Sequence, residues 1–535
     1  MTAGSFKKDQ WISIAAIAAA AGTVLSLLFE LRFAYPALIS LALFAGLGAM
    51  TLGRTDKPRN GTRAPLLIPA ALMFSVWVAM TVLFGGFEFT AILYHLKYGF
   101  ASGGMTGGQM TIVALIVGSL ALVAYFWGKL INLNRRMRLL DRALCLPLLF
   151  LNPASVEIAK SYAAARYEGI PLHEEYALPV TERAANRTKP DLIQIYMESH
   201  ELTFAQHKEF GETMRPLDAF RDRGLFATDV NQVEATTWTV AGQIASQCGI
   251  PALFEISLGE DGKGGRFLPG ARCLGDILSA DGYSLAYFGG AQLEFGSKGD
   301  FFASHGYGEL NGARALFPRY KDHLNFWGVD DDAVLDAAYR RIAQTARNGR
   351  PDATVIMTLS GHGPSGVSSK PCVEGTVKVT EADPTLRAMQ CTNLLIAGFL
   401  ARLEREGFLE NTLVVLQSDH LSRKTSADHL LRGKDRNNYI AILGPEVEPQ
   451  TIDRPATMMD IYPTLLEALG YVLPDGKAGL GVSLLSAEHN LMERFGEDEV
   501  NRSIKGDIEL RRALWHAEPP GLTASAARFS PSGHQ

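Results

Sequence analysis

Long runs of apolar residues dominate the first 155 positions of the chain, whereas apolar and polar residues alternate over shorter distances in the rest. Each long run has about the 17 to 25 residues that an α-helix needs to cross a bilayer. A single run of this kind would be compatible with a signal peptide or a buried helix, but four in succession are not. We therefore predict a transmembrane domain over residues 1–156, whose first four helices correspond to Trp11–Phe29, Tyr35–Leu52, Pro65–Phe84 and Met110–Trp127.

Lysine and arginine are distributed unevenly between the predicted loops, and positively charged loops stay in the cytoplasm. Basic residues precede the first run and follow the second and fourth runs, whereas the loop 85–109 carries only Lys97. The N-terminus is therefore predicted to be cytoplasmic, and loop 85–109 to lie outside. We interpret a shorter apolar stretch, residues 143–156, as a fifth crossing that places the remainder of the chain outside; without it the domain has four helices.

From residue 190 onward, short apolar runs typical of buried strands alternate with amphipathic stretches typical of helices. The strands are predicted at 191–199, 284–289, 353–360, 412–418 and 438–444, and the clearest helices at 331–346 and 392–407. This alternation predicts an α/β domain over residues 190–516, with a mainly parallel sheet and helices on both faces. Residues 157–189 are predicted to connect it to the transmembrane domain, and residues 517–535 to form a flexible tail.

The net charge argues against nucleic-acid binding, and the cysteines indicate disulfide bonds. The chain has 535 residues, a formal net charge of −5 and no basic patch of the kind that binds nucleic acid. Four of the five cysteines lie in the part predicted to be outside, where disulfides form readily. Of the three possible pairings we predict Cys248 with Cys273 and Cys372 with Cys391, because each closes a short loop; buried free thiols are the alternative.

Polar side chains suited to metal binding follow three of the predicted strands. Glu198 lies at the end of the first strand, His362 follows the third, and Asp419 and His420 follow the fourth. The carboxyl ends of strands in open α/β sheets are where ligands bind. Carboxylates and imidazole are suitable ligands for a divalent cation. The pattern therefore predicts a metal site, the alternative being that Asp419 only caps the next element.

Two threonines precede a predicted helix in the segment "EATTWTVAGQIASQCGIP", residues 234–251. Free N–H groups and the helix dipole make the N-terminus of a helix favourable for an anion. A threonine hydroxyl is a weak nucleophile, and it needs a metal or a base to react. A divalent ion held by the acidic and imidazole groups described above would activate Thr236 or Thr237. Alternatively, these threonines only cap the helix.

Four motifs occur in a fixed order: "DLIQIYMES" (191–199), "TTWTVAGQIASQCGIP" (236–251), "TLSGHGP" (358–364) and "VVLQSDH" (414–420). Together they resemble the alkaline phosphatase/sulfatase superfamily. Within it, the chain looks similar to the membrane-anchored phosphoglycerol transferases, relatives of the lipoteichoic acid synthases. The likeness covers roughly residues 190–485. It implies an alkaline-phosphatase-like catalytic domain.

The resemblance also implies roles for individual residues. Thr236 corresponds to the nucleophile, because the family pattern has a Ser or Thr three positions later, here Thr239; Thr237 is the second candidate. One divalent ion is implied, manganese in the first place, with magnesium or zinc as alternatives. The residues that correspond to its ligands are Glu198, Thr236, Asp419 and His420. The residues that correspond to substrate contacts are His362 and Lys298.

The activity implied is transfer of the phosphoglycerol head group of phosphatidylglycerol to a hydroxyl of a periplasmic glucan, through a phosphoglyceryl-threonine intermediate. Such an enzyme would span the bacterial inner membrane, with its catalytic domain on the periplasmic side. The segments "YFGGAQ" and "SGHGP" depart from the pattern of the glucan-modifying enzymes, which leaves the acceptor open. The alternatives are a phosphoethanolamine transferase and, in another class, a catalytically inactive membrane sensor or scaffold.

Overall fold

The computed structural model describes residues 169–179, 182–184, 188–253, 266–423 and 425–515, and the single residues Tyr94, Gly118, Ala159 and Ala163. The chain forms two compact units. One consists of residues 1–89 and 107–162, and the other of residues 90–106 and 163–535. Tyr94 therefore belongs to the same unit as the predicted catalytic domain.

The predicted membrane crossings lie outside the described residues, apart from Gly118 in the fourth. The predicted tail 517–535 also lies outside them, and the connecting segment 157–189 is described only in part. Among the described residues, no helix combines the length and the apolar character that crossing a bilayer requires.

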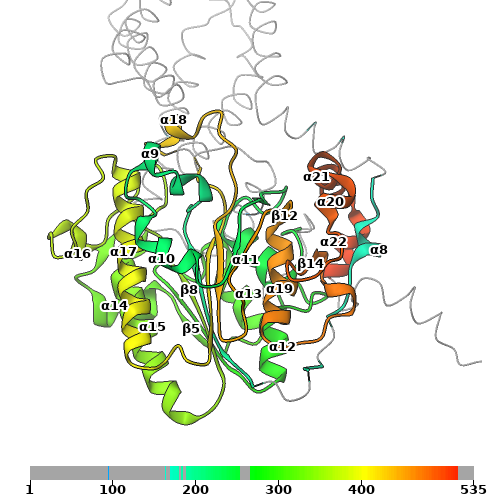
Figure 1. Cartoon of the computed structure of the whole chain (residues 1–535), viewed down its shortest axis with the longest axis horizontal. Coiled ribbons are helices and arrows are strands. Elements are labelled where there is room, and N and C mark those ends of the chain that lie inside the picture. The colour runs from blue at the N-terminus through cyan, green and yellow to red at the C-terminus, as the bar shows by residue number, and fades with distance from the viewer. Residues whose placement is uncertain are drawn as a thin grey trace, which may run out of the picture. The chain divides into compact units, whose positions relative to one another are not determined.

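One sheet of eight strands forms the centre of the second unit (Figure 1). Its strands, in spatial order, are β11 (Gln450–Ile452), β2 (Leu225–Ala227), β10 (Ile440–Leu443), β9 (Thr412–Ser418), β1 (Asp191–Met197), β8 (Asp352–Met357), β4 (Ser284–Gly289) and β5 (Glu309–Asn311). Neighbouring strands are parallel except where β10 runs against β9 and β2. The prediction of an α/β domain with a mainly parallel sheet is confirmed.

All five predicted strands are present. Two of them, 284–289 and 412–418, coincide with β4 and β9, and the other three are shorter than predicted. The three-residue strands β2, β5 and β11 were not predicted. Runs this short carry too few alternating positions to indicate a strand.

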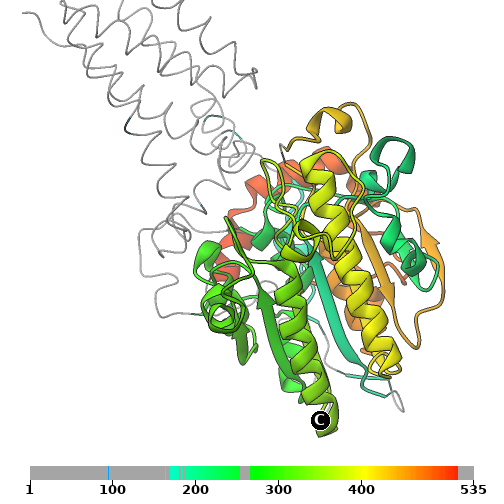
Figure 2. The same ribbon diagram turned by 90° about the vertical axis from the view of Figure 1, so that its left-hand side faces the viewer.

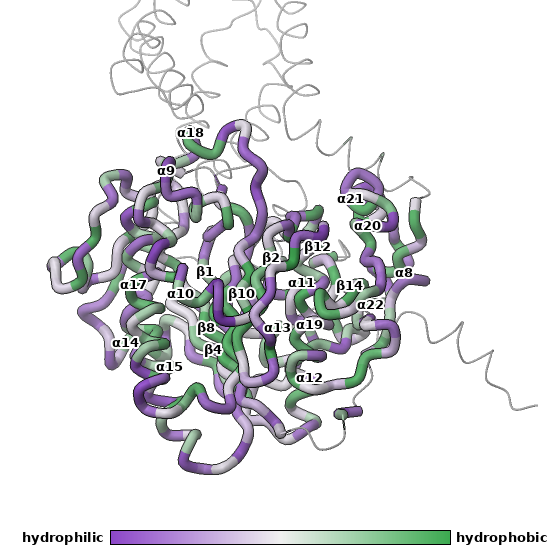
Figure 3. Tube along the Cα trace, viewed as in Figure 1, coloured by the Kyte–Doolittle hydropathy of each residue, from purple (hydrophilic) through white to green (hydrophobic). Residues whose placement is uncertain are grey.

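Helices cover both faces of the sheet, as predicted. Alternate residues of a strand point to opposite faces, so that Leu192 and Tyr196 of β1 join one apolar cluster and Ile193 and Ile195 the other. The first cluster includes residues of α11 (Thr239–Cys248), α12 (Leu274–Ala280) and α19 (Ile461–Ala468). The second includes residues of α15 (Asp331–Thr345) and α17 (Pro384–Arg405), which lie side by side in Figure 2. Figure 3 shows the hydrophobic residues gathered on the central strands.

Shorter elements complete the unit. The remaining helices are α8 (Leu172–Glu175), α9 (His207–Phe210), α10 (Asp218–Arg221), α13 (Lys298–Ser304), α14 (Ala313–Tyr320), α16 (Lys370–Val373), α18 (Asp428–Leu431), α20 (Leu491–Phe495), α21 (Glu497–Gly506) and α22 (Ile508–Trp515). Three two-stranded sheets pair β3 (Val230–Asn231) with β12 (Ala456–Thr457), β6 (Leu324–Asn325) with β7 (Gly328–Val329), and β13 (Lys477–Ala478) with β14 (Gly481–Val482).

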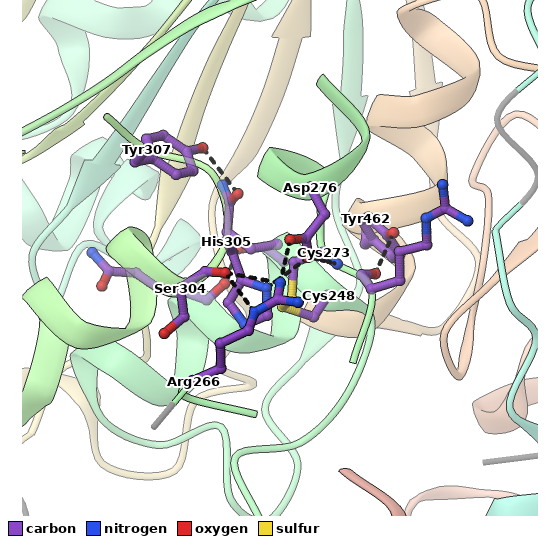
Figure 4. Close-up of a disulfide and its surroundings, with 12 residues drawn as sticks. Cys248, Arg266, Cys273, Asp276, Ser304, His305, Tyr307 and Tyr462 are labelled. Carbon is purple, nitrogen blue, oxygen red and sulfur yellow. Dashed lines mark hydrogen bonds and ion pairs between the residues drawn. A yellow bond between two sulfur atoms is a disulfide. The ribbon is translucent and has the colours of Figure 1, made fainter. Parts of the chain in front are cut away.

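Both predicted disulfides are present. Cys248 at the end of α11 is bonded to Cys273, which caps α12 (Figure 4), and Cys372 of α16 is bonded to Cys391 of α17. The bonds span 25 and 19 positions of the sequence. Loop-closure entropy alone would make each stabilise the fold by about 3 kcal/mol.

Candidate active site

The pairing of the two central strands brings three predicted site residues together. Met197, the last residue of β1, pairs with Ser418, the last residue of β9. The residues that follow the two strands therefore lie next to each other at the same edge of the sheet. Glu198, Asp419 and His420 each offer a ligand atom, and these atoms all lie within 4.8 Å of one another. All three side chains are buried. We refer to Glu198, Asp419 and His420 as the acidic triad.

The two carboxylate oxygens of Asp419 differ in their hydrogen bonding. Its Oδ1 accepts hydrogen bonds from the backbone N–H groups of Ser199 and His420, both at 2.8 Å. Its Oδ2 is buried and has no hydrogen-bond partner among the described residues. A buried carboxylate oxygen without a partner is costly in free energy. The unsatisfied oxygen therefore fits a bound cation.

His420 is oriented by its backbone surroundings. Its Nδ1 lies 2.8 Å from the carbonyl oxygen of Leu421, which can only accept, so Nδ1 carries the proton of that hydrogen bond. Its Nε2 lies 3.5 Å from Glu198 Oε1 and 3.4 Å from Asp419 Oδ2. The ring nitrogen that faces the carboxylates is thus the one that can act as a metal ligand.

The charges in the triad perturb one another strongly. Burial and the nearby charge of Glu198 raise the pKa of Asp419 to about 7. Burial disfavours the charged form of His420, but the two carboxylates outweigh it and raise its pKa to about 9. Burial would also raise the pKa of Glu198, yet the hydrogen bond from His420 and the charges of His362 and His420 hold it below its usual value. Two buried carboxylates in contact are stable together only with positive charge between them.

The donor set of the triad fits a divalent metal ion, since two carboxylates and one imidazole suit manganese, magnesium or zinc. Two other groups of potential ligands exist among the described residues, and several of their atoms are engaged in the protein, although His305 Nε2 and Asp332 Oδ1 have no hydrogen-bond partner there. The sulfur of Cys273 belongs to a disulfide, and its neighbour Asp276 pairs with His305 and Arg266 (Figure 4). In the other group, Asp330 accepts hydrogen bonds from Asn325 and from a backbone N–H group.

The threonines of "TTWT" lie in different surroundings. Thr239 is the first residue of α11, and its hydroxyl donates to Glu198 Oε2 at 3.2 Å. The hydroxyl of Thr236 is buried and donates instead to the carbonyl of Val233 at 2.6 Å. The backbone carbonyl of Thr237 accepts from Arg423. The Thr237 hydroxyl accepts from Arg423 at 3.4 Å, and Thr239 contacts the triad through Glu198.

The two predicted substrate contacts also lie close to the triad. His362 follows β8, and its ring centroid lies 3.7 Å from that of Trp327. Burial lowers the pKa of His362, and the charge of Glu198 opposes this shift. Lys298, the first residue of α13, is buried; burial lowers its pKa to about 8, against the charges of Glu198 and Asp419. Lys298 thus lies in the electrostatic field of both carboxylates, whereas His362 lies in that of Glu198 and is favoured in its neutral form.

Comparison with known proteins identifies the domain. The family model described as Sulfatase matches residues 212–471. The chain contains a sulfatase-family domain. Two curated relatives, both named phosphoglycerol transferase I, come from Escherichia coli O127:H6 (strain E2348/69 / EPEC) and Escherichia coli O81 (strain ED1a). They are 30% identical over 414 and 415 residues, which cover 74% of this chain and 53% of each relative. The chain spans about half the length of the curated relatives it matches.

Solved structures with a likeness to the sulfatase-family domain include a protein of the alkaline phosphatase superfamily from Vibrio parahaemolyticus. It is 18% identical, with a TM-score of 0.46 over 59% of this chain and 74% of that one. The lipoteichoic acid synthase LtaP from Listeria monocytogenes is 13% identical, with a TM-score of 0.48 over 65% of this chain and 98% of that one.

Two side chains of the sulfatase-family domain that support the site were not found from the sequence. Asp331, at the start of α15, accepts from the backbone N–H groups of Leu359 and Ser360, and so holds the turn that leads to His362. Arg423 donates to the carbonyl of Thr237 at 3.1 and 2.7 Å, next to the start of α11. Asp331 begins a predicted helix, and this position gives no signal of its role. Arg423 lies only four positions after Asp419, and this closeness to a predicted site residue is a signal that could have found it.

Gly242 of α11 allows the helix to approach the end of β9. A Cβ atom at this position would lie 1.7 Å from the backbone oxygen of Asp419. We expect Gly242→Ala to force the helix away from the triad and to lower the free energy of unfolding by about 1–3 kcal/mol. Gly398 of α17 provides a matched control, because nothing lies within 4 Å of its Cβ position. Gly398→Ala should instead stabilise the chain by about 0.5–1 kcal/mol. Melting of the two full-length variants, compared with wild type, measures both effects.

Proposed function

We propose that the protein transfers the phosphoglycerol head group of phosphatidylglycerol to an acceptor hydroxyl, through a covalent adduct on Thr239. The observation that carries this proposal is the contact between the Thr239 hydroxyl and Glu198 within the buried triad. The name of the curated relatives, phosphoglycerol transferase I, supports the choice of head group. The proposed nucleophile thus moves from Thr236, the assignment implied by the sequence pattern, to Thr239.

In this proposal Glu198, Asp419 and His420 hold one divalent ion, manganese in the first place. The bound ion supplies positive charge that favours the alkoxide form of a nearby hydroxyl and offsets the charge of a phosphoryl oxygen. Glu198 accepts the hydrogen bond of Thr239 and so directs its proton toward the carboxylate. The N-terminus of α11, which carries Thr239 as its first residue, adds a favourable dipole for an anionic group.

The first step is an attack by Thr239 Oγ1 on the phosphorus of phosphatidylglycerol. The bond between phosphorus and the glyceride oxygen breaks, and diacylglycerol leaves after its oxygen takes up a proton. Lys298 supplies a buried positive charge that offsets the negative charge of the phosphodiester, and the neutral ring of His362 can donate a hydrogen bond to it. The product of this step is phosphoglyceryl-Thr239.

In the second step the acceptor hydroxyl attacks the same phosphorus and loses its proton, and the bond to Thr239 Oγ1 breaks. The threonine recovers a proton and is ready for another turnover. Two in-line displacements give net retention of configuration at phosphorus and ping-pong kinetics. We propose a glycan of the periplasm as the acceptor.

The proposed setting is the bacterial inner membrane, with residues 1–156 as a multi-pass anchor and the catalytic domain on the periplasmic side. The apolar runs of the sequence support this setting. The donor is itself a membrane lipid, so that an anchored site meets it at the membrane surface. One alternative is catalytic: a phosphoethanolamine transferase would use the same triad on another head group. A silent scaffold is disfavoured, because it has no need of a buried pair of carboxylates in which Asp419 Oδ2 accepts no hydrogen bond from the described residues.

The test uses the full chain, purified in detergent and supplied with manganese and phosphatidylglycerol labelled in the glycerol head group. We expect label to pass to added glucan, with one diacylglycerol released for each group transferred. Phosphatidylethanolamine labelled in its head group serves as the matched control and should transfer little or no label. Transfer from phosphatidylethanolamine alone would show that this lipid, and not phosphatidylglycerol, is the donor. Absence of transfer from both lipids, in the presence of bound metal, would rule out the proposed reaction.

A further inference from the structure

Tyr94 lies far from the proposed site residues in sequence but packs against segments that adjoin them. Its side chain is only 1% exposed and belongs to the same apolar cluster as α11. Its hydroxyl donates to the carbonyl of Gly296 at 2.8 Å, across 202 positions of the sequence. Its ring centroid lies 5.3 Å from that of Trp238. A tyrosine with a buried ring and a satisfied hydroxyl is held in one place.

Both partners of Tyr94 adjoin residues of the proposed site. Trp238 is the N-cap of α11 and directly precedes Thr239. Gly296 lies two positions before Lys298, which begins α13. Tyr94 therefore contacts both the segment that carries the proposed nucleophile, Thr239, and the segment that carries the buried Lys298.

The segment before Lys298 has an unusual backbone. Gly296 and Ser297 both have left-handed conformations, with φ values of 66° and 52°. For the serine this conformation is unfavourable, and it persists only where the surroundings hold it in place. The carbonyl that accepts from Tyr94 belongs to the peptide group between these two residues. The hydrogen bond thus acts at the point where the chain turns into α13, whose first residue is the buried Lys298.

We propose that Tyr94 is a positioning residue, which completes the site by fixing the segments of Thr239 and Lys298 against the acidic triad. This inference rests on the proposed function for its kinetic consequence, but its structural part stands alone. Tyr94 lies in the loop 85–109, which the sequence predicts to be outside the membrane. A residue between two predicted membrane helices then controls the geometry of the catalytic domain on the same side of the membrane.

The kinetic test removes only the hydroxyl. We expect Tyr94→Phe to lower kcat by about tenfold, the effect of losing one positioning hydrogen bond. Tyr283→Phe is the matched control. The Tyr283 hydroxyl is also buried and donates to a backbone carbonyl, that of Pro190, at the opposite ends of the parallel strands. This control should melt at a lower temperature and keep the wild-type kcat. Equal kcat in wild type and Tyr94→Phe would overturn the proposal.

A double-mutant cycle separates positioning from general packing. Tyr94→Phe is combined with Lys298→Ala in the full chain. If Tyr94 acts through Lys298, it should reduce kcat far less in the Lys298→Ala background than in wild type. Fully additive losses would mean that Tyr94 does not position Lys298.

A cross-link tests the contact without any activity. Tyr94 is replaced by p-benzoylphenylalanine in the full chain, and the chain is irradiated and digested. We expect a link to the peptide that contains Trp238 or to the one that contains Gly296. A link only to other peptides would overturn the placement of Tyr94. If wild type fails to use phosphatidylglycerol, the proposed function falls, whereas the cross-link still decides whether Tyr94 lies at this site.

Discussion

Replacing Thr239 by alanine is expected to abolish phosphoglycerol transfer while leaving the fold and metal binding intact. The change removes the hydroxyl that contacts Glu198 but none of the acidic triad. Alanine is a good helix former, so α11 should still begin at the same place. Loss of a covalent nucleophile costs a factor on the order of 10⁴ or more in kcat. The measurement is head-group transfer by the full chain, together with its content of bound manganese.

The alanine variant of Thr236 is the control. Thr236→Ala removes a hydrogen bond to the carbonyl of Val233, so a loss of about 1 kcal/mol in stability is expected, with most of the activity retained. Wild-type protein incubated with labelled donor and no acceptor should carry the label on the peptide that contains all three threonines. Fragmentation of that peptide by mass spectrometry identifies the residue. Label on Thr236 would restore the assignment from the sequence pattern, and label on no threonine would exclude the covalent mechanism.

The parallel core of the sheet could be predicted because its strands are covered on both faces. β9 has four successive apolar residues, and β4 carries mostly apolar side chains, which separates both from amphipathic helices. β2 and β11 lie beyond the antiparallel β10, and each has only three residues. Pairing with a neighbour, and not local sequence, decides that such segments become strands.

The acidic triad could be predicted because each of its residues directly follows a recognisable strand. Parallel strands end at one edge of the sheet, so that residues far apart in sequence meet there without further information. The proposed nucleophile is harder to assign from the sequence, because three threonines lie within four positions. Which of them faces Glu198 depends on where α11 begins, and helix boundaries are uncertain by one or two residues.

Side chains that act through tertiary contacts gave no local signal. Gln194 and Gln417 lie inside strands and bond to each other at 3.1 Å within the core, where the sequence suggested only apolar packing. Tyr94 lies between two apolar runs, and nothing in its neighbourhood indicates a partner 202 positions away. Such contacts depend on the complete fold, because they join elements that only meet once the sheet has formed.

Replacing Asp419 by asparagine is expected to remove both the bound metal and the transfer activity. The amide keeps the shape of the side chain and its acceptor oxygen, which can still accept from the N–H groups of Ser199 and His420. It loses the negative charge that balances the cation. We expect manganese affinity to fall by more than about 100-fold, since changes in outer-shell partners alone cost up to that factor. Titration of the full chain with manganese measures this loss.

Asp460→Asn is the control for replacing a buried aspartate. Asp460 accepts from the backbone N–H groups of Val482 and Thr457, and burial raises its pKa to about 6. This variant should be less stable than wild type but should bind manganese with the same stoichiometry. Manganese binding by Asp419→Asn with wild-type affinity would exclude Asp419 as a ligand and, with it, the proposed metal site.

The pH dependence of stability provides a second readout of Asp419 that needs no substrate. Burial and the charge of Glu198 raise its pKa in the folded protein from 3.8 to about 7. Between these values the folded protein retains a proton that the unfolded chain releases, so the free energy of unfolding of the metal-free protein should fall as pH rises through this window. Manganese affinity should rise over the same window, because the metal competes with that proton. The asparagine in Asp419→Asn has no proton to release. The free energy of unfolding of this variant should therefore fall less with rising pH than that of wild type. Its manganese affinity should not increase as the pH rises.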